Sequence, residues 1–435
     1  MEKVRDADLK RQELLDKLSD PGILPIITLG RVGKGNFAAA TIIADAVGLS
    51  YRPGEGSAYQ SGMVLKLDDV VHEPLDVANL RVLQTGHSFI ARGEHVATVY
   101  SRMTERGIRK KGLIRPSAAK DIAAALARRP KREVICTSAD VALAILDNDS
   151  GIKVTLLATD MILRDSALDP RITAFIVQGE RTISQISSGL DGRNPVIINA
   201  GVLTHPVVIE AYDHQALARR REKFTHPEKE VFHALDVSSG SGPVMGRCQE
   251  MVRGCYDFIK SGRLKFTFWF GRHREQAEQL QDFIRKLTIP AQVVNEFREG
   301  PWGGIRIICD ENLPRSVTTL FGIFSETDFI LSTGDETTLL AAASGIPKLI
   351  YRGDAGWPDI QRGVWEAANA DWAIQNGFAV PLPRGERKHA GEFITSLLND
   401  GKNGVTFRTM MDNMQTKLPH PSTAITKLYN AVNQM

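Results

Sequence analysis

The most constraining feature of the sequence is a strand–turn–helix–strand unit near residue 340. An apolar run at 329–331 ends in a short polar turn at 332–334, and a helix of small residues then continues to Gly345. A second strand is expected directly afterwards, at 347–351. Short, continuous apolar strands joined through a helix are typical of a parallel sheet covered by helices on both faces. The unit therefore predicts an α/β fold.

The same alternation extends along most of the chain. Strands are expected at residues 23–29, 80–84, 133–137, 154–158, 174–177, 196–198, 231–237, 264–270, 291–294 and 305–308. Helices are expected at residues 2–18, 38–47, 118–128, 139–146, 244–259, 274–287, 317–325 and 422–432. A strongly charged segment at 213–230 interrupts this rhythm and indicates a passage between two series. We therefore predict two doubly wound, Rossmann-like domains, at residues 1–212 and 213–421.

Composition excludes several classes of protein. The chain has 435 residues, a formal net charge of +3 and 7% aromatic residues, which argues against a nucleic-acid partner. No apolar stretch reaches the roughly 18 residues that span a bilayer, and the charged N-terminus is not a signal peptide, so a cytoplasmic protein is expected. The four cysteines show no metal-ligand spacing, which favours reduced thiols and no metal site.

The first glycine-bearing turn follows the expected strand at 23–29. It contains Gly33, Lys34, Gly35 and Asn36 and precedes an alanine-rich helix. It is not a phosphate-binding P-loop, because that motif requires a serine or threonine directly after the lysine. Close approach of the backbone to a ligand and a plain tight turn are both compatible with this pattern.

Two further turns combine small hydroxylated residues with glycine between a strand and a helix, at 236–243 and 332–334. Amides at such helix starts lack internal partners, and hydroxyl groups can donate to anionic oxygens. A flexible loop and simple helix capping are the alternatives. Ligands of open parallel sheets bind at the carboxyl ends of strands, where all three turns lie. We expect a diphosphate group to contact Ser238, Ser239, Gly240, Ser241, Thr333 and Gly334.

The chain resembles the GT-B glycosyltransferase superfamily, in particular the branch with the peptidoglycan N-acetylglucosaminyltransferase and the diacylglycerol glycosyltransferases. The resemblance is carried by residues 33–36, 154–160, 199–206, 238–242 and 331–351. It implies two Rossmann-like domains facing a central cleft, with a C-terminal helix that crosses back to the first domain, here residues 422–433. It also implies transfer of a sugar from a nucleotide diphosphate-sugar donor to an acceptor hydroxyl, without metal or other cofactor.

The resemblance assigns roles to single positions, with departures. Gly33, Lys34 and Gly35 would form the acceptor-side loop, and Asn36 stands where the family often has a catalytic histidine. An amide cannot take up a proton at neutral pH. The family's ribose-binding glutamate corresponds to Leu340. We expect the polar residues one turn earlier, Asp335, Glu336 and Thr337, to contact the donor instead.

Five further residues are candidates for chemistry or binding. Asp160 ends a central strand and can deprotonate an acceptor hydroxyl, while His87, in a polar loop, titrates near neutral pH. Helix capping by Asp160 and a structural role for His87 are the alternatives. Arg272 follows a strand through a glycine and can bind a diphosphate, or it is a solvated charge at a helix start. Asp359 and Gln361 match positions where the family binds donor-sugar hydroxyls, or they belong to an ordinary polar loop.

Two other functions stay open at this level. A nucleotide-sugar 2-epimerase shares the fold, and a GT-B-like protein without catalysis would explain Asn36 and Leu340. Basic clusters at 106–115 and 128–132 are compatible with a lipid or glycan acceptor at a membrane surface, or with solvated helix faces.

Overall fold

The computed structural model describes residues 2–28, 34–48, 61–67, 70, 118–163, 167–190, 192–205, 212, 214–237, 245–271, 273–294, 303–310, 313–351, 364–382, 390–399 and 401–433. The chain divides into two compact units. The first unit comprises Met1–His87, Val99–Pro206 and Ser422–Met435, and the second comprises Ser88–Thr98 and Val207–Pro421. The end of the chain therefore belongs to the first unit.

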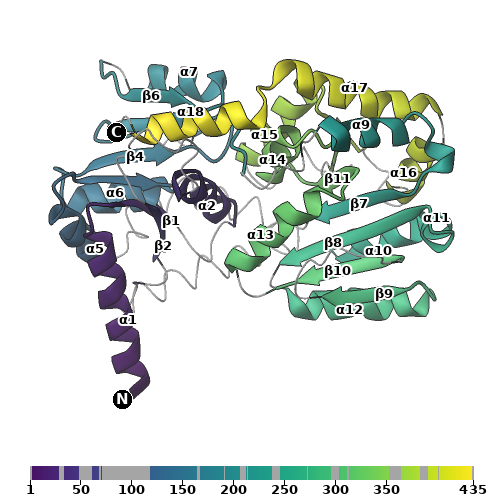
Figure 1. Ribbon diagram of the computed structural model, residues 1–435, viewed down its shortest axis with the longest axis horizontal. Coiled ribbons are helices and arrows are strands. Elements are labelled where there is room, and N and C mark those ends of the chain that lie inside the picture. Colours follow the sequence, from purple (N-terminus) through teal and green to yellow (C-terminus); the bar gives the residue numbers. More distant parts are fainter. Residues whose placement is uncertain are drawn as a thin grey trace. The chain divides into compact units, whose positions relative to one another are not determined.

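The first unit is built on a six-stranded parallel sheet with the order β2-β1-β3-β4-β5-β6. The strands are β1 (Ile23–Thr28), β2 (Ser61–Lys66), β3 (Glu133–Cys136), β4 (Lys153–Leu157), β5 (Ala174–Val177) and β6 (Val196–Asn199). Its described helices are α1 (Glu2–Leu18), α2 (Lys34–Gly48), α5 (Ala118–Ala127), α6 (Ala139–Asn148), α7 (Glu180–Gly189) and α18 (Pro421–Asn433) (Figure 1).

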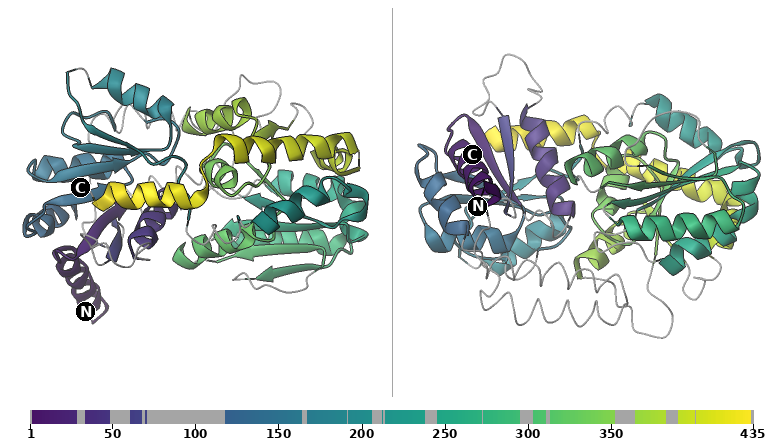
Figure 2. Two further views of the ribbon diagram at one scale, coloured as in Figure 1. Left: turned by 45° about the horizontal axis from the view of Figure 1, so that its top comes forward. Right: turned by 90° about the horizontal axis from the view of Figure 1, so that it is seen from below.

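The second unit is built on a seven-stranded parallel sheet with the order β13-β12-β11-β7-β8-β10-β9. The strands are β7 (Phe232–Val237), β8 (Leu264–Gly271), β9 (Ala291–Val294), β10 (Ile305–Cys309), β11 (Phe329–Ser332), β12 (Lys348–Ile350) and β13 (Ala379–Pro381). The helices are α9 (His214–Lys223), η4 (Pro227–Lys229), α10 (Met245–Gly254), α11 (Tyr256–Lys260), α12 (Arg274–Lys286), α13 (Leu313–Phe324), α14 (Thr337–Ala343), α15 (Val364–Gln375), α16 (Ala390–Asn399) and α17 (Gly401–Lys417). Helices lie on both faces of each sheet (Figure 2).

The structure confirms the predicted α/β class with two parallel sheets. Strand β2 was not expected, because its sequence mixes small, apolar and charged residues in a short run. The expected helix at 244–259 is divided into α10 and α11 at Cys255. The strand expected at 80–84 lies outside the described residues.

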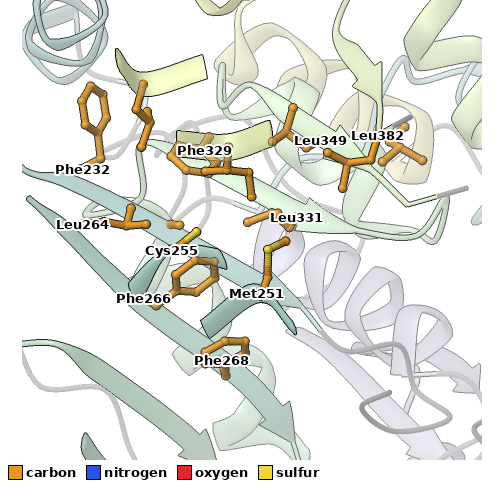
Figure 3. Packing of buried hydrophobic residues seen from close by; sticks show 14 of the residues in the cluster. Phe232, Met251, Cys255, Leu264, Phe266, Phe268, Phe329, Leu331, Leu349 and Leu382 are labelled. Atoms are coloured by element: carbon orange, nitrogen blue, oxygen red, sulfur yellow. The ribbon is translucent and has the colours of Figure 1, made fainter. Parts of the chain in front are cut away.

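Phenylalanine side chains dominate the core of the second unit (Figure 3). Phe266 and Phe268 on β8 stack with ring centroids 4.9 Å apart. Phe224, after α9, stacks on Phe407 of α17 with a centroid distance of 4.5 Å. Full burial of each such side chain stabilises the fold by roughly 1.5–3 kcal/mol. This core fixes the helices against the sheet whose edge carries the candidate site.

The charged segment at 213–230 is not a free passage, because α9 packs within the second unit. Lys223 donates to both carboxylate oxygens of buried Asp328, at 3.1 and 2.9 Å. Arg220, itself buried, donates to the carbonyl oxygen of Thr327 at 2.9 Å. The backbone amide of His233 donates to the Asp328 carboxylate at 2.8 Å. The charges that resemble a linker in the sequence therefore pair with partners about 100 residues away.

Close backbone packing at Gly404 provides a test of how tightly α17 packs. A Cβ atom at this position would lie 2.0 Å from the Phe224 carbonyl oxygen, whereas at Gly246 of α10 it would meet nothing within 4 Å. We expect Gly404→Ala to lower the free energy of unfolding by about 2 kcal/mol through overpacking. Gly246→Ala should leave it unchanged or raise it by up to about 1 kcal/mol. Urea denaturation of both variants measures the difference, and equal stabilities would contradict the close packing.

His233 predicts how the second unit responds to acid. Burial, followed by the charge of nearby Lys223, lowers the pKa of His233 to about 3. Below its usual pKa the unfolded chain binds a proton that the folded chain does not, so stability falls as the pH decreases from about 6.5 to 3. We expect His233→Gln to flatten this decline by up to about 1.4 kcal/mol per pH unit. Urea denaturation between pH 7 and pH 4 tests this, with exposed His226→Gln as the control.

Candidate functional site

Each sheet contains a reversal point, where the strand order switches from one side of the first strand to the other. In the second sheet, β8 and β11 lie on opposite sides of β7, and Leu331 of β11 is in register with Asp236 of β7. In the first sheet, β2 and β3 lie on opposite sides of β1. Crossover helices on opposite faces leave a crevice beyond the carboxyl ends of the two strands at such a point, and ligands of doubly wound sheets bind there. The three glycine-bearing turns predicted from sequence follow β1, β7 and β11, which form these two reversal points.

The turn after β11 is filled by a buried polar cluster. The Ser332 hydroxyl lies 3.0 Å from the Asp335 carboxylate and 2.8 Å from the Thr337 hydroxyl, which also donates to Asp335. The Lys348 ammonium donates to the hydroxyls of Thr337 and Thr338, at 3.0 and 2.7 Å, and lies 3.6 Å from Asp335. Asp335 therefore has partners within the turn, and its predicted contact with a donor sugar stays a prediction.

Lys348 is an unusual residue for the middle of a parallel sheet. Its side chain is almost fully buried, and this burial, opposed by the charge of Asp335, lowers the pKa of Lys348 to about 8. A buried ammonium without a counter-charge is strongly disfavoured. The pair with Asp335 therefore neutralises the turn after β11, where a lone carboxylate would repel an anionic ligand.

Gly334 lies against the backbone of α15. A Cβ atom there would be 2.0 Å from the carbonyl oxygen of Glu366, so only glycine fits. Protein therefore covers one side of the turn in which open amides were expected. The Thr333 hydroxyl oxygen is also buried, and among the described residues it has no hydrogen-bond partner. The Thr333 hydroxyl is therefore available to a ligand that reaches this turn.

A second buried cluster lies on the other side of the reversal point. Asp236, near the end of β7, is fully buried and accepts hydrogen bonds from Arg247 of α10 and from the hydroxyl of Tyr351, both at 3.0 Å. The Arg247 guanidinium lies 4.1 Å from the centroid of the Tyr351 ring. Burial and then the charge of Asp236 raise the pKa of Tyr351 well above 10, so the phenol stays protonated and donates. The sequence analysis missed all three residues, because they are separated by 11 and 104 positions.

Polar side chains also gather at the carboxyl edge of the first sheet. Thr28 is the last residue of β1, and Thr137 directly follows β3. Their side chains are buried, and the two hydroxyls lie 2.8 Å apart. Asp160 lies three residues beyond β4, is half-buried and accepts a hydrogen bond from Thr159 at 3.3 Å. No helix begins in the described residues 161–163, so Asp160 is not a helix cap there. Its role as a base stays a prediction.

A histidine–carboxylate pair in the first unit was also missed. His205 is buried, and its Nε2 atom lies 2.8 Å from the carboxylate of Asp45 on α2, which is about half exposed. The pair joins the segment after β6 to α2 across 160 positions. The sequence contains both residues but does not show that they meet, since the strands between them decide their proximity.

Several predicted residues fall outside the described part of the chain. These are Gly33, His87, Ser238, Ser239, Gly240, Ser241, Arg272, Asp359 and Gln361. Lys34, Gly35 and Asn36 form the first turn of α2. Glu336 directly precedes α14 and is half-buried. Among the described residues, no group of three or more histidines, cysteines or acidic residues has a metal-binding arrangement.

Comparison with known proteins identifies the fold. No protein-family model and no curated protein matches the sequence. The UDP-GlcNAc 2-epimerase from Neisseria meningitidis, bound to UDP-GlcNAc, matches with a TM-score of 0.51 and 11% identity, over 92% of this chain and 97% of that chain. An α,α-trehalose 6-phosphate synthase from Burkholderia multivorans matches with a TM-score of 0.50 and 11% identity, over 95% and 98%. The chain has the GT-B fold.

A third GT-B structure extends this likeness. The UDP-forming α,α-trehalose-phosphate synthase from Burkholderia xenovorans, in complex with glucose-6-phosphate, matches with a TM-score of 0.50 and 11% identity, over 94% of this chain and 98% of that chain. The GT-B likeness thus covers both units of the chain rather than one Rossmann-like half. In the described residues, no helix is both long and apolar enough to cross a membrane.

The Lys348–Asp335 pair gives a testable coupling inside the GT-B second unit. Removing one partner of a buried ion pair leaves the other uncompensated, at a cost of about 3–5 kcal/mol. We expect Lys348→Met and Asp335→Asn each to destabilise the protein, and the double variant to lose less than the sum, with a coupling energy of about 1–3 kcal/mol. Urea denaturation of the four proteins measures the cycle, and additive effects would show that the two charges do not interact.

Proposed function

We propose that the chain is an enzyme that uses a nucleotide diphosphate-sugar and transfers the sugar to an acceptor hydroxyl. The observation that carries this proposal is the carboxyl edge of the second sheet. There the strand order reverses between β7 and β11, and buried polar clusters flank the reversal point on both sides. The GT-B structures that match the whole chain include one bound to UDP-GlcNAc and one described as UDP-forming, which supports this class of ligand.

The two units have different roles in this proposal. The second unit holds the donor, with Thr333 and the loop at 238–241 near the diphosphate and with Arg272, Asp359 and Gln361 as further donor contacts. In the first unit, Asp160 accepts the proton of the acceptor hydroxyl. The acceptor oxygen bonds to the anomeric carbon, and the bond between that carbon and the diphosphate breaks. Helix-terminal amides and cationic groups stabilise the charge that develops on the leaving group.

The finer features of the proposal rest on the sequence resemblance. These are membership of the peptidoglycan and diacylglycerol glycosyltransferase branch, chemistry without a metal ion, and action in the cytoplasm. A lipid or glycan acceptor at a membrane surface belongs to the same group, with Gly33, Lys34 and Gly35 on the acceptor side. His87 and Asn36 remain candidates for the catalytic constellation beside Asp160.

A nucleotide-sugar 2-epimerase is the second candidate, because it also binds a nucleotide sugar and one of the matching GT-B structures is such an enzyme. Epimerisation requires acid–base groups at carbon 2 of the donor sugar, whereas transfer requires a base for the acceptor. The products therefore separate the two candidates.

Incubation with a panel of nucleotide sugars tests the proposed function. We expect release of nucleoside diphosphate from at least one donor, slowly with water alone and faster with the correct acceptor. Asp160→Asn should lower the rate by about 10²–10⁴-fold, because a general base contributes that much, while leaving donor affinity within about twofold. Chromatography of the nucleotide and sugar products provides the readout. A 2-epimerised sugar would favour the second candidate, and binding without any turnover would contradict both.

A further inference from the structure

The buried Asp236 carboxylate is shared between two donors that approach different oxygens. Nη2 of Arg247 donates to Oδ1, and the hydroxyl of Tyr351 donates to Oδ2, each at 3.0 Å. An arginine beside a free carboxylate usually forms two parallel hydrogen bonds, one to each oxygen. Tyr351 occupies the second oxygen, so Arg247 is restricted to a single hydrogen bond with Asp236.

This restriction leaves most of the guanidinium unused. Arg247 has five N–H donors, and within the described part of the chain only Nη2 has a hydrogen-bond acceptor. Its Nε atom is buried and has no hydrogen-bond partner among the residues that the structure describes, and the residue as a whole is only 8% exposed. Buried donors are nearly always paired, so an unpaired guanidinium N–H indicates a missing acceptor. The planar face of the same group lies over the ring of Tyr351, which fixes its orientation.

The position of the cluster indicates which acceptor is missing. Asp236 pairs in register with Leu331 at the reversal point of the sheet, and Arg247 lies in the first turn of α10. Tyr351 directly follows β12, the neighbour of β11. The cluster therefore belongs to the carboxyl edge at which GT-B sheets are open to ligands. A guanidinium with unused donors, placed beside a helix N-terminus, fits an anionic oxygen.

We propose that Arg247 binds the diphosphate group of the nucleotide ligand, and that Tyr351 keeps it available by occupying the second oxygen of Asp236. This inference rests on the proposed function, since it assigns a group within the same ligand site. Tyr351 is a positioning residue, because it acts on the ligand through Asp236 and Arg247. Asp236 orients the guanidinium and competes with the ligand for it.

Because Asp236 and the ligand compete for Arg247, we can predict whether each substitution raises or lowers the affinity for a diphosphate. Tyr351→Phe frees Oδ2, the guanidinium then pairs with both oxygens of Asp236, and affinity for a diphosphate falls. Asp236→Asn removes the competing charge, and affinity for a diphosphate rises. If the cluster only stabilised the fold, both variants would either lose affinity for a diphosphate or keep it. Opposite signs therefore distinguish ligand binding from a role in stability.

The experiment measures the dissociation constants of uridine diphosphate, inorganic pyrophosphate and uridine by calorimetry. For the two phosphate-containing probes, we expect Tyr351→Phe and Arg247→Lys to weaken binding by about fivefold to tenfold, and Asp236→Asn to strengthen it by a similar factor. Uridine binding should change by less than about twofold in each variant, because uridine lacks the diphosphate.

Two matched controls come from the same unit. Tyr256→Phe removes a phenol whose hydroxyl contacts exposed Lys260, and Arg253→Lys alters an arginine of the same helix that lies over Phe283. Neither should change the affinity for any probe. If the wild-type protein binds uridine diphosphate, and Tyr351→Phe and Tyr256→Phe bind it with equal affinities, this inference alone is overturned. Absence of wild-type binding to every phosphate-containing probe would instead overturn the proposed function. If Asp236→Asn does not fold, the loss in Tyr351→Phe against its control still decides the result.

Discussion

Parallel pairing of β7 with β11 is the interaction on which the rest of the second unit depends. Parallel strands place their carboxyl ends on one edge, so Asp236 near the end of β7, the turn after β11 and Tyr351 after β12 lie at that edge although they are far apart in the sequence. The chain passes from β7 to β8 on one side and later returns from β10 to β11 on the other side of β7, which leaves a crevice beyond the strand ends at this point. A single pairing of backbone hydrogen bonds thus brings the candidate ligand groups together.

Buried charge then sets the chemistry of that edge. The pairs Lys348–Asp335 and Arg247–Asp236 each bring an acidic group into the interior beside a cation, and neither pair carries net charge. Isolated carboxylates at these positions would repel a diphosphate, and isolated cations would destabilise the fold. Paired charges allow an acidic turn to lie beside an anionic ligand. The same physical rule explains the Lys223–Asp328 pair, which instead fixes α9 far from the candidate site.

The predictability of the chain depends on how local each signal is. Runs such as Leu264–Gly271 and Phe329–Ser332 contain enough consecutive apolar residues to identify buried strands without any partner. Strand β2 contains an apolar run, Met63–Leu65, as long as that of Phe329–Ser332, which the sequence analysis did not assign to a strand, and β2 pairs with β1 along its whole length. The charged segment containing α9 resembled a linker because its partners, Thr327 and Asp328, are remote in the sequence.

The candidate site divides in the same way. The sequence by itself determined the α/β class, the two parallel sheets and the turn after β11, because periodicity, glycine and small hydroxylated residues act over a few neighbouring positions. The turns expected after β1 and β7 lie largely outside the described residues. Only the tertiary structure decided that Asp335 is paired with Lys348, that Gly334 lies against α15, and that Asp236 is shared by Arg247 and Tyr351. These contacts depend on which strands become neighbours, and strand order is set by packing of the whole sheet rather than by any local run of residues.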